Sequence, residues 1–179
     1  ALQNLGGSIW GATISNNGAD ATNDLDIAAG EAVSDDALIA NRRLMAISAL
    51  TKQTDAAWAV GTNQGCWDTG SVANGMVHVF AIFRTDTSVT DMLCRASVSS
   101  PTMPASYTKK RRLGSLPRAS GAMVGFIQDG DTFDFKSAPQ DYNQSPGGLT
   151  AVTIQLSVAS GASVTAKVAV SAYSVNQGP

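Results

Sequence analysis

Few side chains of this chain belong to the types that carry out catalysis, and they are scattered. His78 is the only histidine in 179 residues, and it interrupts the apolar run 76–83. A histidine in such a run is more often a hydrogen-bonded core residue than a general base. The sequence has no HExxH pair, no glycine-rich phosphate loop and no GxSxG elbow. We therefore expect no catalytic residue, no cofactor and no enzyme, although sequence alone does not exclude a dispersed Ser/His/Asp triad.

Carboxylates are concentrated in one segment near the N-terminus, and such a cluster is a candidate for a metal site. They are Asp20, Asp24, Asp26, Glu31, Asp35 and Asp36. Calcium prefers oxygen ligands clustered in a loop, but the spacing here is not that of an EF-hand. Because Asp and Asn are ordinary turn residues, we expect turns and no metal.

One basic cluster stands out, formed by Lys109, Lys110, Arg111 and Arg112. On a strand, Lys109 and Arg111 point to one face and the other two to the opposite face. The cluster is then not a continuous stripe, as a nucleic-acid site would be. We expect solvated side chains or pairs with carboxylates across strands. The alternative is contact with an anionic glycan or a lipopolysaccharide phosphate, for which Arg111 is the candidate.

Three tryptophans, Trp10, Trp58 and Trp67, are candidate sugar platforms. Trp67 lies in the glycine-rich stretch 63–70 beside Asp68, where an indole would be exposed. Tryptophan more often fills a core, so that alternative stays open. The candidate ligand-binding residues are therefore Trp67, Asp68 and Arg111.

The cysteine content and the net charge limit the disulfides and the binding partners that this chain can have. Cys66 and Cys94 are the only cysteines. They permit one bridge but match no disulfide framework, and we expect two reduced thiols, with Cys94 in the core. The net charge of −2 and the 15% of charged residues give no general attraction for nucleic acid or anionic membrane. No apolar run is long enough for membrane insertion.

Apolar residues recur with a period of two, which indicates strands. We expect strands at 43–50, 76–83, 91–97 and 107–116, and a hairpin of 123–127 with 132–135 around Asp129-Gly130. A second hairpin is expected at 152–158 and 164–170, around Ser160-Gly161. Helix is limited to one or two short turns, at 55–58 and more weakly at 35–41. The pattern predicts an all-β fold, an antiparallel, jelly-roll-like β-sandwich of about 8–10 short strands.

The whole chain, 1–179, is expected to be one domain. It opens with Ala and stops at Gly178-Pro179, so we expect a piece of a longer fibre chain.

Several stretches together resemble a module of bacteriophage tail-fibre and related virion proteins. They are NDLDIAAG (23–30), LTKQ (50–53), WAVG (58–61), DTG (68–70), NG (74–75), HVFAI (78–82), PTMPASYTKKRRLGS (101–115), SG (120–121) and FIQ (126–128). Two features depart from it: Cys66-Trp67 stands where a Gly-Leu-like pair is expected, and a long shaft is lacking. The resemblance implies a homotrimer located in the virion that contacts other virion proteins.

Three functions compete at this point. The favoured one is a virion structural protein, a tail-fibre or tail-tip domain that recognises a host cell-surface receptor, either a glycan or a protein. The second is a capsid decoration or head-fibre protein with a purely structural role. The third, an enzyme acting on cell-surface polysaccharide, is the least favoured.

Overall fold

The chain is almost wholly β-structured. The computed structural model describes residues 8–69, 72–137, 140–143, 153–159 and 161–171. These residues form thirteen strands and one 3-10 helix, Ile39–Asn41. The all-β class predicted from the period-two pattern is confirmed. Nowhere in the described ranges is a helix long and apolar enough to cross a membrane.

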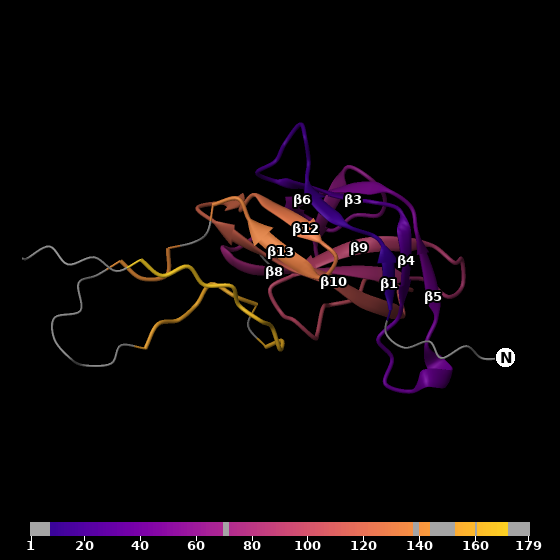
Figure 1. The fold of residues 1–179 in the computed structure, drawn as a ribbon. Coiled ribbons are helices and arrows are strands. Elements are labelled where there is room, and N and C mark those ends of the chain that lie inside the picture. The colour runs from indigo at the N-terminus through magenta and orange to yellow at the C-terminus, as the bar shows by residue number, and fades with distance from the viewer. Residues whose placement is uncertain (1–7, 70–71, 138–139, 144–152, 160, 172–179) are drawn as a thin grey trace, which may run out of the picture.

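The main sheet has eight strands, in the order β11-β10-β8-β9-β7-β6-β3-β2 (Figure 1). Its strands are β2 (Ile14–Asn16), β3 (Asp24–Ile27), β6 (Leu50–Ala57), β7 (Gln64–Trp67), β8 (Gly75–Phe83), β9 (Thr90–Arg95), β10 (Lys109–Ala119) and β11 (Ala122–Met123). The pairs β6–β7 and β7–β9 are parallel, so the expectation of a wholly antiparallel fold is wrong there. Residues 58–63 bring the chain back to the start of β6, where Asn63 N–H donates to the Thr51 carbonyl at 2.8 Å.

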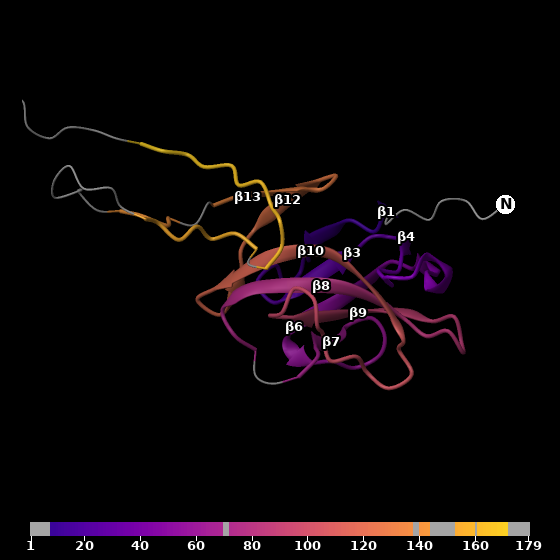
Figure 2. The same ribbon diagram turned by 90° about the horizontal axis from the view of Figure 1, so that it is seen from below.

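Two smaller sheets cover one face of the main sheet. The first contains β1 (Ile9–Gly11), β4 (Gly30–Val33) and β5 (Leu44–Ile47), and the second is the hairpin of β12 (Phe126–Asp129) and β13 (Thr132–Phe135). Figure 2 shows the hairpin and the N-terminal strands on the same side of β8 and β10. The hairpin confirms the Asp-Gly prediction, because Asp129 pairs with Thr132 and Gly130 takes a φ of 57°.

The core lies on both faces of β8, the strand that the apolar run 76–83 forms. Val79 and Ala81 belong to the large cluster under the smaller sheets. Phe80 and Ile82 belong to a second cluster on the opposite face, closed by Tyr107 from the connection between β9 and β10. Strands β9 and β10 also lie where the sequence placed them, whereas the expected strand 43–50 is divided between β5 and the start of β6.

Cys66 and Cys94 form a disulfide, so the expectation of two reduced thiols is wrong. Strand β7 lies beside β9, with Trp67 in register with Cys94. The Cα atoms of Cys66 and Cys94 are 5.0 Å apart, within the span that a disulfide bridges. Both cysteines are fully buried in the large core cluster. Nothing in the local sequence shows that two strands 28 residues apart become neighbours.

Two local expectations fail because tertiary context outweighs the local pattern. Residues 55–58, expected to be a helical turn, continue β6 as far as Ala57. Residues 153–159 and 161–171 form no strand, although they carry the alternating pattern; Val152 and Ser160 lie outside the described residues. The expected hairpin is therefore wrong for the described part. Only in the weaker helix candidate, 35–41, does a helical turn form, at Ile39–Asn41.

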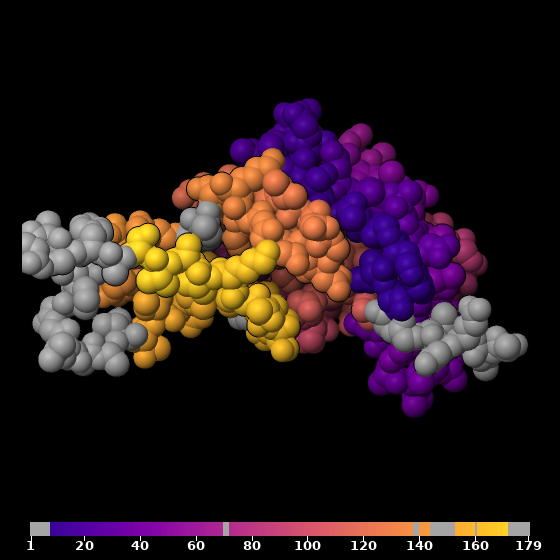
Figure 3. Space-filling model, viewed as in Figure 1, coloured from indigo at the N-terminus to yellow at the C-terminus, as the bar shows by residue number. Residues whose placement is uncertain are grey.

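The alternating segment lacks a surface to bury its apolar side. Val164, Val168 and Val170 are 47%, 58% and 85% exposed. Figure 3 shows the segment 161–171, in yellow, at the hairpin end of the molecule, away from the β1-β4-β5 sheet. An alternating pattern becomes a strand only when an edge is available to pair with it.

Candidate functional site

Trp67 is a core residue, the alternative that the sequence left open, so its candidacy as an exposed ligand-binding indole is wrong. It lies on β7 and is 3% exposed. Its indole N–H donates to the carbonyl of Thr54 on β6. A sugar platform has to present the face of its ring to solvent, and Trp67 does not.

The carboxylate of Asp68 also has its partners within the fold. Its side chain is 1% exposed and forms an ion pair with Arg95 at the end of β9. The same carboxylate accepts the backbone N–H of Thr102 at 2.7 Å and that of Thr69 at 2.7 Å. Asp68 thus fastens the loop that follows β9. Arg95 was missed at the sequence level, because its partner lies 27 residues away.

Trp67, Asp68 and Arg95 line one shallow hollow of about 350 Å³. Two of the three candidate ligand-binding residues therefore lie at the same hollow, as neighbours in the sequence must. Because both side chains already have their partners within the fold, this hollow has little left to offer a ligand.

Arg111 lies at a second hollow, at the edge of the main sheet. Strand β10 pairs with β8 along one side; on the other side, within the described part of the chain, β11 pairs with it only at Arg118 and Ala119. Arg111 is in register with Ala81, and Arg112 with Phe80, so their side chains leave opposite faces as predicted. Because the edge is open, both still line the same hollow, which has a volume of about 400 Å³.

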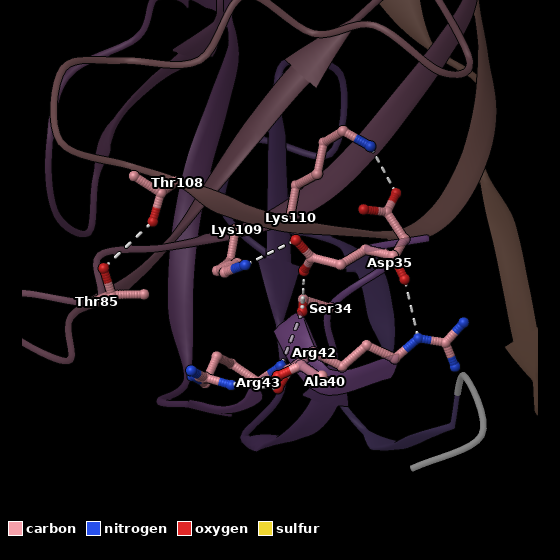
Figure 4. Close-up of polar contacts among 10 residues, drawn as sticks. Ser34, Asp35, Ala40, Arg42, Arg43, Thr85, Thr108, Lys109 and Lys110 are labelled. Atoms are coloured by element: carbon pink, nitrogen blue, oxygen red, sulfur yellow. Dashed lines mark hydrogen bonds and ion pairs between the residues drawn. The ribbon is translucent and has the colours of Figure 1, made fainter. Parts of the chain in front are cut away.

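The two lysines of the basic cluster are paired, as predicted. Lys109 Nζ lies 2.7 Å from Asp36 Oδ1, and Lys110 Nζ lies 2.6 Å from Asp35 Oδ2 (Figure 4). Burial alone would raise the pKa of Asp36, but hydrogen bonds from Lys109 and Ser34 bring it below its usual value. Asp35 also donates its backbone N–H to the Lys110 carbonyl at 2.9 Å, which fixes this segment on the edge of β10.

Arg112 is held by a short polar relay. Its Nη1 donates to Ser115 Oγ at 3.0 Å, and Ser115 Oγ lies 2.7 Å from Nδ1 of His78 on β8. Because Ser115 accepts from Arg112, its own hydroxyl is free to donate to Nδ1. The remaining proton of a neutral His78 then lies on Nε2, a buried atom that has no partner in the described residues.

The electrostatics of the hollow favour an anion. Among the described residues, three cationic side chains line it, Lys110, Arg111 and Arg112, together with one carboxylate, that of Asp35. The Lys110 ion pair already occupies that carboxylate. Burial, and then the nearby charge of Arg111, lower the pKa of Arg112. Two guanidinium groups that repel each other gain from an anion placed between them.

The other tryptophans differ in exposure. Trp10 on β1 is 54% exposed. Trp58 is half-buried, donates to the Met92 carbonyl at 3.0 Å and packs edge-on against Tyr107. Only Trp10 presents the ring surface that a sugar platform needs.

Trp58 adjoins a buried ion pair that sequence reasoning missed. Lys52 Nζ lies 2.8 Å from Asp91 Oδ1, with the two side chains 1% and 3% exposed. Burial lowers the pKa of Lys52, while its contact with Asp91 opposes that shift. The Lys52 ammonium also donates to the Ala59 carbonyl at 2.8 Å, so two of its three N–H donors have partners. The pair joins β6 to β9 beneath the Trp58 ring.

The early carboxylates serve turns and pairs. Asp20 accepts the backbone N–H groups of Thr22 and Asn23, and Thr51 donates to Asp26 at 2.7 Å. Within the described ranges, no group of three or more His, Cys, Asp or Glu residues is placed to hold a metal ion.

His78 is a fully buried core residue, as its position in the apolar run predicted. Burial, followed by the charge of Arg112, lowers its pKa. Its contact with Ser115 uses Nδ1, whereas the Ser-His-Asp arrangement places the serine on Nε2 and a carboxylate on Nδ1.

Comparison with known proteins adds no assignment: no protein-family model, curated protein or solved structure matches this chain.

Proposed function

We propose that this chain is a structural domain of a bacteriophage particle, part of a tail fibre or tail tip, that recognises a host cell-surface receptor. The observation that supports recognition is the basic hollow at the open edge of β10. A chain with a net charge of −2 concentrates three cations there around one carboxylate. Many bacterial surface glycans carry phosphate or carboxylate groups, which such a site attracts.

The scaffold suits this role. The disulfide joins β7 to β9 and the Lys52–Asp91 pair joins β6 to β9, so the main sheet that carries β10 is cross-linked at two places. Function in β domains usually resides where loops meet such a rigid sheet. Here the loop after β9, through Ser99, and the segment at Ser163 complete the hollow.

We further propose that the domain assembles as a homotrimer and contacts other virion proteins. The exposed valines of 161–171 support this, because an alternating segment that finds no edge in its own chain can pair with an edge of another copy. Sedimentation at micromolar concentration tests it: a trimer is expected, and a monomer would contradict it.

The alternative proposal is a capsid decoration or head-fibre subunit with a purely structural role. It is favoured by exposed apolar side chains that do not line the basic hollow: Leu38, Ile39 and Leu44 are 68%, 62% and 47% exposed. Clusters of this kind mark protein contacts.

Gold-labelled antibody against the domain, viewed on intact particles by electron microscopy, separates the two proposals. Label at the tail end is expected, together with binding of the purified domain to host cells. Label over the head, with no affinity for cells, would overturn host recognition and favour decoration.

A further inference from the structure

We propose that the hollow at the edge of β10 is a binding site for a phosphate or carboxylate group, held by Arg112 and reported by His78. The inference deepens the proposed function by naming the chemical class of its ligand. It does not require that the ligand come from a host.

Arg112 is the residue positioned for this task. The described part of the chain offers no carboxylate to its guanidinium, which donates instead to the neutral hydroxyl of Ser115. That hydrogen bond uses Nη1 and leaves further N–H donors of the planar fork available. Since Ser115 is itself held by His78, the guanidinium is oriented before a ligand arrives.

The neighbouring lysines do not compete for the role. Lys110 is neutralised by Asp35, and Lys109 by Asp36. Lys110 also lies 5.9 Å above the ring centroid of Phe80, which fixes its side chain along the sheet. Lys110 therefore shapes the wall of the site, whereas the Arg112 guanidinium supplies the planar donors that match a phosphate or carboxylate.

The protonation state of His78 should report whether an anion is bound to Arg112. The charged groups facing it are Arg112, across the Ser115 relay on β10, and Arg95, its register partner on β9, which Asp68 neutralises. Arg112 is thus the unbalanced charge that opposes protonation of His78. An anion on Arg112 reduces that opposition and raises the pKa of His78. By linkage, binding then strengthens as the pH falls.

The test uses sulfate, which does not titrate in the working range, with the ring protons of the single histidine followed by NMR. A saturable shift with a dissociation constant of about 1 mM is expected. Sodium chloride at equal ionic strength should not reproduce it. Titration of His78 with and without sulfate should show the rise in its pKa. No saturable shift, or an identical one with chloride, would overturn the site.

Two variants of equal charge change provide the control. Arg112→Gln should weaken sulfate binding at least about tenfold, whereas Lys109→Gln, on the same strand but outside the hollow, should not. If Arg112→Gln does not fold, Arg111→Gln tests the same hollow. Equal affinity in the folded variants would refute the assignment.

Sugar ligands then separate the sources of the anion. Glucose 1-phosphate and glucuronate are compared with neutral glucose, which should not bind. Sulfate binding without any binding to host cells would leave the anion site standing and refute host recognition. Host binding that survives in Arg112→Gln would leave host recognition standing and refute this hollow as the receptor site.

Discussion

Loss of the Cys66–Cys94 disulfide should be the most costly covalent change in this domain. The bridge joins residues 28 positions apart. Closing a loop of that length removes about 12 cal/mol/K of entropy from the unfolded chain, or about 3.5 kcal/mol at 25 °C. The parallel contact between β7 and β9 includes only one residue pair in register, Trp67 with Cys94, so the ladder alone holds these strands weakly. A domain of this size should lose roughly 7–14 °C in melting temperature.

The assay compares urea unfolding of wild type with that of the Cys66→Ala/Cys94→Ala double variant, with and without dithiothreitol. Wild type should show no free thiol when denatured without reductant. Reductant should destabilise wild type towards the double variant and leave the double variant unchanged. If wild type titrates two thiols, or if the double variant unfolds within about 0.5 kcal/mol of wild type, the reasoning about this bridge is refuted.

Three further outcomes follow from buried contacts. Burial holds the pKa of His78 below its usual value of 6.5, so the unfolded chain binds a proton more readily than the folded one. The free energy of unfolding should therefore fall as the pH drops below 6.5. Urea titrations at pH 5–7 should show a flatter dependence in His78→Leu. Asp91→Asn leaves Lys52 buried without its counter-charge and should cost about 3–5 kcal/mol in urea unfolding, while adding Lys52→Met should recover part of the loss. Gly65→Ala should cost about 1–3 kcal/mol or more, because its Cβ would lie 2.0 Å from the Ala57 carbonyl oxygen; Gly18→Ala, where nothing lies within 4 Å, is the control, and equal thermal melts would contradict the prediction.

The parts of the fold that sequence predicted are those determined by local chemistry. The apolar run 76–83 is long enough to be read as a strand buried on both faces, and β8 is buried in this way. Asp129-Gly130 tolerates the backbone of a tight turn, and the hairpin forms there. In both cases the cause lies within about ten residues of its effect.

Features that depend on distant neighbours could not be predicted in the same way. The disulfide and the Asp68–Arg95 pair both require β7 to lie parallel to β9, a pairing that no local pattern indicates. The 152–170 segment shows the opposite failure. Its alternation is strong, yet in the described residues it pairs with no edge, because a periodic pattern specifies which side is apolar and not which surface will cover it.

The basic cluster shows how topology changes the meaning of an alternating pattern. In the middle of a sheet, Arg111 and Arg112 would lie on opposite faces, separated by the sheet itself, and no common ligand could reach both. Strand β10 is instead an edge strand along most of its length, so the two side chains can meet around that edge. The argument that alternation excludes a continuous nucleic-acid stripe still holds, since the charges converge on one hollow rather than along a line. The same geometry that rules out a long polyanion therefore favours a single anionic group.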